Sequence, residues 1–139
     1  MTISYPGFDE LRTGQRLTGR LTVTEAHLVL ASGIFGDFAP LHVDEEFAKQ
    51  TAVGARVVPG ALIVGVATGA LGKNLGPNVE RCLDQQVRFR DPVLPGDTVT
   101  TVWEVVEKRD DHVVRLDVVC TTQHGKVVLE GSATFVLAG

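Results

Sequence analysis

Apolar and polar residues alternate through the C-terminal part of the chain, which is the pattern of half-buried β-strands. The alternation predicts four strands, at residues 79–90, 97–108, 112–123 and 126–137. Turn residues separate these strands, and His124-Gly125 is short enough for a tight hairpin. A strand of about 12 residues extends roughly 40 Å at about 3.3 Å per residue, well above the average length. Antiparallel strands of this length must curve, so we expect them to curl around another element.

Residues 59–76 contain the longest apolar stretch, at 60–71, and predict one central helix of about four turns. Pro59 suits the first helical position, where a missing N–H costs nothing, and Gly72 or Gly76 suits the end. No charged residue lies between Gly60 and Gly72, so we expect the helix to be buried nearly all round. The segment is too short and too rich in glycine to span a bilayer.

Small residues recur at every fourth position on one face of this helix, at Ala61, Gly65 and Gly69. A sheet backbone or a second subunit could pack very close to such a bare face. One long helix wrapped by one curved antiparallel sheet is the hotdog architecture, an α+β fold that leaves edge strands exposed. We therefore expect a hotdog domain that forms a homodimer or a larger homo-oligomer through those edges.

The N-terminal part predicts shorter elements. Residues 15–23 alternate well enough for a strand, and Thr24 is placed to cap a helix at residues 25–34. Residues 43–50 suit a short helix, because acidic residues at its start and a lysine near its end complement the helix dipole. Residues 51–58 are expected to form the loop that leads to the central helix.

The composition narrows the class of protein. The 139 residues are 44% apolar, which is enough for one core, and we expect a single domain, 1–139. The formal charge of -4 comes without a long charged run, which disfavours nucleic-acid and anionic membrane partners. Cys82 and Cys120 stand alone, with no CxxC motif and no Cys/His cluster, so we expect free thiols and no metal site. The first residues lack a basic region followed by an apolar one, which favours a cytoplasmic location.

Asp37 and His42 lie five positions apart across Pro40, in a segment that reads as too irregular for helix or strand. Gly36 supplies backbone freedom, and the residue before Pro40 is pushed toward an extended conformation, so a bend can direct both side chains to one point. There they could hold a water molecule between them and transfer its proton. The alternative is structural: Asp37 orders the turn and His42 packs beside it.

Three segments of the chain carry a family resemblance. They are Gly36-Asp37-Phe38-Ala39-Pro40-Leu41-His42-Val43-Asp44, the helix start Pro59-Gly60-Ala61-Leu62, and residues 87–99, VRFRDPVLPGDTV. Together they closely resemble the MaoC-like (R)-specific enoyl-CoA hydratases, from about residue 17 to residue 137. The resemblance implies a hydro-lyase that adds water reversibly across the 2,3 double bond of a 2-enoyl thioester, on coenzyme A or on a carrier protein. It implies no cofactor beyond the coenzyme A of the substrate.

The resemblance also implies roles for individual residues. Asp37 would take a proton from water, His42 would orient that water and help to pass a proton to C2, and the Gly60 N–H would stabilise the thioester oxygen. Substrate-binding positions are implied at Ala39, Pro40, Pro59 and Gly65. The CoA phosphates would need cations, and five are available: Arg56, Lys73, Arg81, Arg88 and Arg90.

Four positions depart from the pattern that is common in this family. It commonly has Ser or Thr at the position of Phe35, Asn at Ala39, His at Pro59 and Ser at Gly65. The polar surroundings of the acid and the histidine are therefore thinner, which points to a changed substrate preference or activity.

Two other functions stay open. A hotdog thioesterase shares the fold and the ligand, but its catalytic carboxylate commonly lies on or beside the central helix, and residues 61–71 contain no acid. A non-catalytic acyl-thioester-binding subunit is compatible with Ala39 and Pro59, whereas the intact Asp37 and His42 favour an enzyme.

Overall fold

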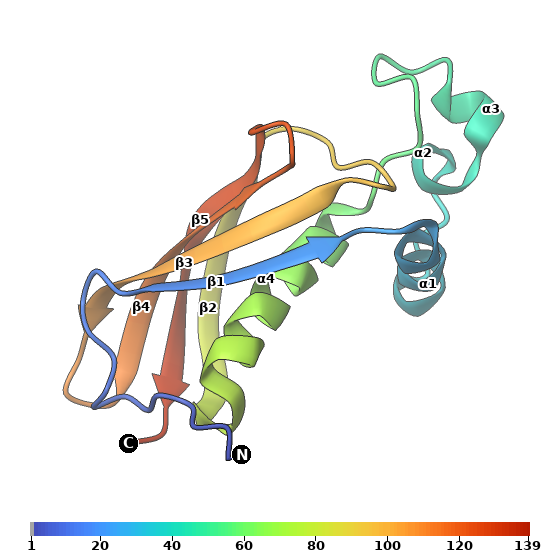
Figure 1. Cartoon of the computed structure of the whole chain (residues 1–139). Coiled ribbons are helices and arrows are strands. Elements are labelled where there is room, and N and C mark those ends of the chain that lie inside the picture. Colours follow the sequence, from blue (N-terminus) through green and yellow to red (C-terminus); the bar gives the residue numbers. More distant parts are fainter. Residues whose placement is uncertain (1) are drawn as a thin grey trace.

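The computed structural model describes residues 2–139 and has the predicted α+β fold (Figure 1). One five-stranded antiparallel sheet, with the strand order β1-β3-β4-β5-β2, curls around the long helix α4. The hotdog architecture and the five expected strands are confirmed. The strands are β1 (Arg16–Thr22), β2 (Val79–Phe89), β3 (Thr98–Lys108), β4 (Val113–Thr121) and β5 (Val127–Leu137).

The alternation along the strands decides which face of the sheet is buried. In β3 every second residue from Val99 to Val105 is buried, because these side chains share the face that packs on the helix. Trp103, only 2% exposed, donates from Nε1 to the carbonyl oxygen of Ala67 in α4 at 2.7 Å. Its ring meets Phe135 of β5 edge to face, with ring centroids 6.2 Å apart. The core therefore lies between the sheet and α4.

Helix α4 (Gly60–Leu75) starts one residue later than predicted. Pro59 is not its first residue but the residue before it, with φ -55° and ψ 136°, an extended conformation that ends the preceding loop. Gly60 therefore takes the first helical position. At the other end Gly76 has φ 52°, which is unfavourable for a side chain with a Cβ, and this glycine ends the helix as expected.

Only one face of α4 is buried, so the prediction of burial nearly all round is wrong. The buried residues are Ile63, Ala67, Ala70, Leu71 and Leu75. The small residues Ala61, Gly65 and Gly69 are exposed, and a Cβ added at either glycine would meet no atom within 4 Å. A single sheet covers only one side of a helix, so the lack of charge on the other side does not reflect burial within this chain. The bare face does not pack on the sheet, so the first of the two expected partners is wrong.

Three short helices form a lobe beyond one end of the sheet: α1 (Glu25–Phe35), α2 (Pro40–Val43) and α3 (Glu45–Ala48) (Figure 1). The helix expected at residues 43–50 is thus shorter, and the segment around Pro40, expected to be irregular, contains one helical turn. Asp44 separates α2 from α3 with φ -114° and ψ 103°. Its Oδ1 accepts a hydrogen bond from the Phe47 N–H at 2.9 Å, so Asp44 caps α3.

The outer edges of the sheet are β1 and β2. Strand β2 is poorly covered, with Leu83 46% and Phe89 53% exposed. Both cysteines are free, Cys82 exposed and Cys120 buried. Within residues 2–139, no helix is long and apolar enough to cross a membrane.

Candidate active site

Asp37 and His42 meet at the junction of α1 and α2. Helix α1 ends at Gly36, whose φ of 67° lets the chain turn away from the helix axis. Asp37 follows, and its Oδ1 accepts a hydrogen bond from the Ala39 N–H at 3.2 Å. Pro40 then starts the turn of α2 that contains His42. As a result, Asp37 Oδ2 lies 3.3 Å from His42 Nε2, and the two side chains predicted to act together are in contact.

The His42 ring is held by a backbone carbonyl. Its Nδ1 lies 2.7 Å from the carbonyl oxygen of Val57, in the loop before α4. Because a carbonyl oxygen only accepts, Nδ1 carries a proton and donates it to this bond. Nε2 is therefore the nitrogen that faces Asp37. The His42 side chain is 11% exposed and that of Asp37 42%, so one member of the pair is held by protein and the other reaches water.

His42 and Gly60 line the same cavity, which has a volume of about 530 Å³. Its wall is mostly apolar and includes Leu41, Val57, Ile63, Phe89, Val93 and Val128. As the first residue of α4, Gly60 has no hydrogen-bond acceptor for its N–H among residues 2–139. A cavity with apolar walls, an imidazole and a free N–H can hold an acyl group and polarise a carbonyl oxygen.

Close packing is also a reason for glycine at position 60. A Cβ there would come 2.9 Å from two carbon atoms of the Phe89 ring, which is closer than real Cβ atoms approach. The structural reason and the proposed chemical reason for Gly60 are therefore compatible.

The predicted substrate-binding residues are only partly brought together. Ala39 and Pro40 are exposed beside Asp37, and Pro59 is buried next to Gly60. Gly65 lies elsewhere, on the exposed face of α4, where it lines a second cavity of about 260 Å³ between α4 and β1. Asp37 contacts His42 but does not itself line the 530 Å³ cavity.

The candidate cations differ in their surroundings. Arg56 is bound by two carboxylates, with Nη1 2.7 Å from Glu25 Oε1 and Nε 2.5 Å from Glu45 Oε2. These bonds lower the pKa of Glu25 and raise that of Arg56, and they make Arg56 a poor candidate for CoA phosphates. Arg90 pairs with Glu130 and lines the 530 Å³ cavity. The other three candidates do not line it: Lys73, Arg81 and Arg88.

Two features of the site were not found from the sequence. The first is the Val57 carbonyl, which any residue would supply, so no sequence signal marks it. The second is Phe89 beside Gly60. It belongs to the segment 87–99, which carries part of the family resemblance but was given no role in the site.

Comparisons with known proteins agree with this picture. Residues 10–127 match the sequence profile of a family described as MaoC like domain. The chain is 33% identical over 133 residues to the (R)-specific enoyl-CoA hydratase of Rhodospirillum rubrum, covering 94% of this chain and 90% of that protein. It is 33% identical to the 3-hydroxybutyryl-CoA dehydratase of Methylorubrum extorquens, covering 91% and 80%. The solved (R)-hydratase from Aeromonas caviae involved in PHA biosynthesis matches with a TM-score of 0.85 at 30% identity, covering 92% and 98%.

Proposed function

Because the chain belongs to the MaoC-like domain family, we propose that it hydrates enoyl thioesters at the site formed by Asp37, His42 and Gly60. The activity is that of a hydro-lyase: water adds reversibly across the 2,3 double bond of a 2-enoyl-CoA and gives a 3-hydroxyacyl-CoA. The observation that carries the assignment of the site is the His42 ring, held at Nδ1 by Val57 with Nε2 3.3 Å from Asp37.

In the proposed first step Asp37 takes a proton from water while the water oxygen forms a bond to C3. The electron pair of the double bond shifts toward C1, and the thioester oxygen gains negative charge. The Gly60 N–H is placed to donate to that oxygen, with the start of α4 adding its positive dipole. In other enzymes the loss of one such donor costs about 3 kcal/mol of transition-state stabilisation.

In the second step Asp37 passes the proton from water to His42 Nε2 across the 3.3 Å contact, and Nε2 delivers it to C2 as the enolate collapses. Nδ1 keeps its own proton on the Val57 carbonyl, so Nε2 is the nitrogen that gains and then releases a proton. One water molecule is consumed, and both side chains end in their starting states. The cycle needs no metal or redox cofactor, and coenzyme A enters only as part of the substrate.

Hydrolysis of the thioester is the less favoured alternative. Helix α4, from Gly60 to Leu75, contains no aspartate or glutamate that could attack or activate water from the helix. The carboxylate that does contact an imidazole lies in the lobe, at Asp37. A purely binding role leaves this contact without a purpose.

We also propose that the protein acts as a homodimer or larger homo-oligomer in the cytoplasm. The support is the poorly covered edge strand β2 and the bare exposed face of α4, which is too apolar for a surface in water. Sedimentation of the purified protein measures its oligomeric state directly. A monomer at micromolar concentration contradicts the proposal.

The activity is tested with crotonyl-CoA and with a longer 2-enoyl-CoA. We expect loss of the conjugated enoyl-thioester absorbance without release of thiol, and no loss with the Asp37→Ala protein. Release of free thiol assigns a thioesterase instead. Absence of both signals contradicts catalysis on these substrates.

A further inference from the structure

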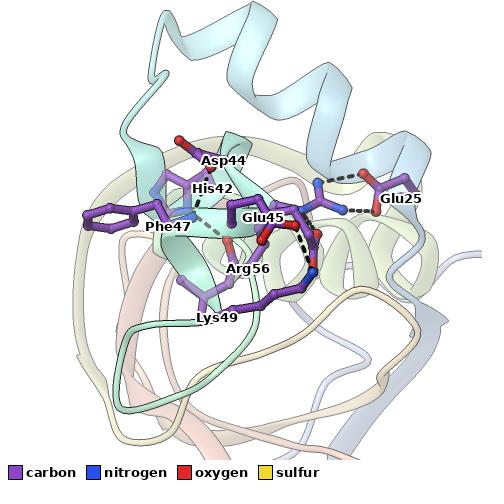
Figure 2. A network of polar contacts seen from close by, with 9 residues as sticks. Glu25, His42, Asp44, Glu45, Phe47, Lys49 and Arg56 are labelled. Carbon is purple, nitrogen blue, oxygen red and sulfur yellow. Dashed lines mark hydrogen bonds and ion pairs between the residues drawn. The ribbon is translucent and has the colours of Figure 1, made fainter.

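Arg56 connects three parts of the lobe through one guanidinium group. Nη1 and Nη2 bind both oxygens of Glu25, at 2.7 and 2.9 Å, and Nε binds Glu45 at 2.5 Å (Figure 2). Glu25 is the first residue of α1, and Glu45 is the first residue of α3. Arg56 itself lies in the loop before α4, and its side chain is 20% exposed.

The residue after Arg56 holds the catalytic histidine. The Val57 carbonyl accepts the bond from His42 Nδ1, and the Val57 N–H donates to the Leu41 carbonyl at 3.2 Å. Helix α1 leads directly to Asp37, and α3 begins just after the turn that carries His42. The guanidinium of Arg56 therefore joins the element before Asp37, the element after His42 and the loop that holds the His42 ring.

Apolar packing orders only part of this lobe, through the buried residues Leu28, Ala31 and Ala48. Its larger apolar side chains point mostly to solvent: Val29, Leu30, Ile34, Phe35, Phe38, Val43 and Phe47 are each at least 46% exposed. Directional polar contacts must then define how the loop lies against α1 and α3. A forked, charge-assisted bond from arginine restricts orientation as well as distance.

We propose that Arg56 is a positioning residue that holds the Val57 carbonyl against His42 Nδ1 and so fixes which nitrogen faces Asp37. The role rests on the proposed hydration at this site. Without the guanidinium, the loop can move away from α1 and α3, and the His42 ring gains freedom to rotate or to change tautomer. A loss of about 1 Å in placement lowers turnover by up to about 100-fold in other enzymes.

The test compares Arg56→Ala, Arg56→Lys and a control, Lys49→Ala. Lys49 pairs with Glu46 on α3 at 2.8 Å, so the control removes an ion pair of the same lobe that has no link to Val57. Two quantities are measured: kcat and KM for enoyl-CoA hydration, and the ¹⁵N chemical shifts of the His42 ring, assigned with His42→Gln. The ring shifts report the tautomer and do not depend on turnover.

For Arg56→Ala we expect kcat to fall about 10- to 100-fold with KM changed less than about threefold, and the His42 signals to change from one tautomer to a mixture. Arg56→Lys should restore part of the turnover and part of the single tautomer. Lys49→Ala should change neither kcat nor the tautomer. An unchanged tautomer in Arg56→Ala overturns the proposal, as does an equal loss of kcat in Lys49→Ala. If the wild-type protein shows no hydration, the proposed function fails while the tautomer measurement still decides the role of Arg56.

Discussion

The sheet with α4 and the lobe of α1 to α3 are built by different interactions. Between the sheet and α4, apolar side chains such as Phe135 and Leu116 are buried completely or nearly so. In the lobe most of the larger apolar side chains are exposed, with Leu28 buried. Its directional contacts are a capping carboxylate, an imidazole bonded to a carbonyl and a shared guanidinium. Burial of apolar surface stabilises the fold without a preferred direction, whereas a hydrogen bond fixes the distance and orientation of the groups that it joins. Changes in the first region should therefore affect stability, and changes in the second should affect activity.

The largest effect on activity without an effect on stability is expected from Asp37→Asn. Asparagine keeps an oxygen for the Ala39 N–H but cannot take a proton from water, so turnover should fall about 10²- to 10⁴-fold with the Tm unchanged. Asp44→Asn is the matched control, since asparagine caps a helix as well as aspartate does. The chain has one tryptophan, Trp103 in the core, and its fluorescence should be identical in all three proteins. Near wild-type turnover in Asp37→Asn contradicts the proposed base.

Phe135→Ala is expected to lower the stability of the fold and to leave kcat nearly unchanged. Phe135 is 1% exposed and packs edge to face on Trp103, so its loss removes apolar contacts and leaves a cavity. Such changes cost about 3 to 5 kcal/mol. Urea unfolding followed by Trp103 fluorescence should show this loss, whereas kcat per folded molecule should stay close to that of the wild type. A large fall in kcat at full folding would mean that the two regions are more strongly coupled than their contacts indicate.

A smaller effect, local to the lobe, is expected from Asp44→Ala. The carboxylate of Asp44 accepts from the Phe47 N–H at the start of α3, and removing a cap of this kind costs about 1 kcal/mol. Amide hydrogen exchange should become faster in residues 45–48 and stay unchanged in β3 and β4. Equal acceleration throughout the chain would show that the lobe and the core unfold together.

The same contrast explains what could be predicted from the sequence. The strands follow from periodicity, because burial of one face imposes a repeat on the residues, whereas α4 follows from a long uncharged segment that begins after a proline and ends at a glycine. The error about α4 has a related cause: an uncharged helix face at Gly65 and Gly69 predicts a covered face, and the pattern does not say whether this chain or another covers it. The Asp37–His42 contact was predicted because both residue types lie close together around a proline.

Contacts made by the backbone or across long separations leave little trace in a single sequence. The Val57 carbonyl that orients His42 would be present with any residue at position 57. Arg56 and Glu25 lie 31 positions apart, and their pairing depends on how the α1 helix meets the loop. For that reason Arg56 looked free to bind phosphates, whereas the structure has it occupied by two carboxylates.

The smallest expected effect is a pH dependence that arises in the lobe alone. Arg56, chiefly through its hydrogen bond, lowers the pKa of Glu25 below its ordinary 4.5 in the folded protein. The unfolded chain therefore binds a proton before the folded one as the pH falls. This contribution to stability is present above pH 4.5 and is lost as the pH drops through the folded-state pKa. Because the Glu25 side chain is 55% exposed, solvent screening keeps it below about 1 kcal/mol.

Glu25→Gln removes the titrating group and tests this sign. Urea unfolding is measured between about pH 3 and pH 7, a range that extends from below to well above the ordinary glutamate pKa. The free energy of unfolding of the variant should be lower than that of the wild type at neutral pH, and the two values should converge in acid. Glu46→Gln is the control, since within residues 2–139 Glu46 pairs only with Lys49, the residue that follows the same short helix. The two regions differ here as well, because no aspartate or glutamate is buried among residues 2–139, so the core between the sheet and α4 has no carboxylate that could give the same pH dependence. A constant difference between Glu25→Gln and the wild type at every pH would mean that the Arg56 contact does not depend on the charge of Glu25.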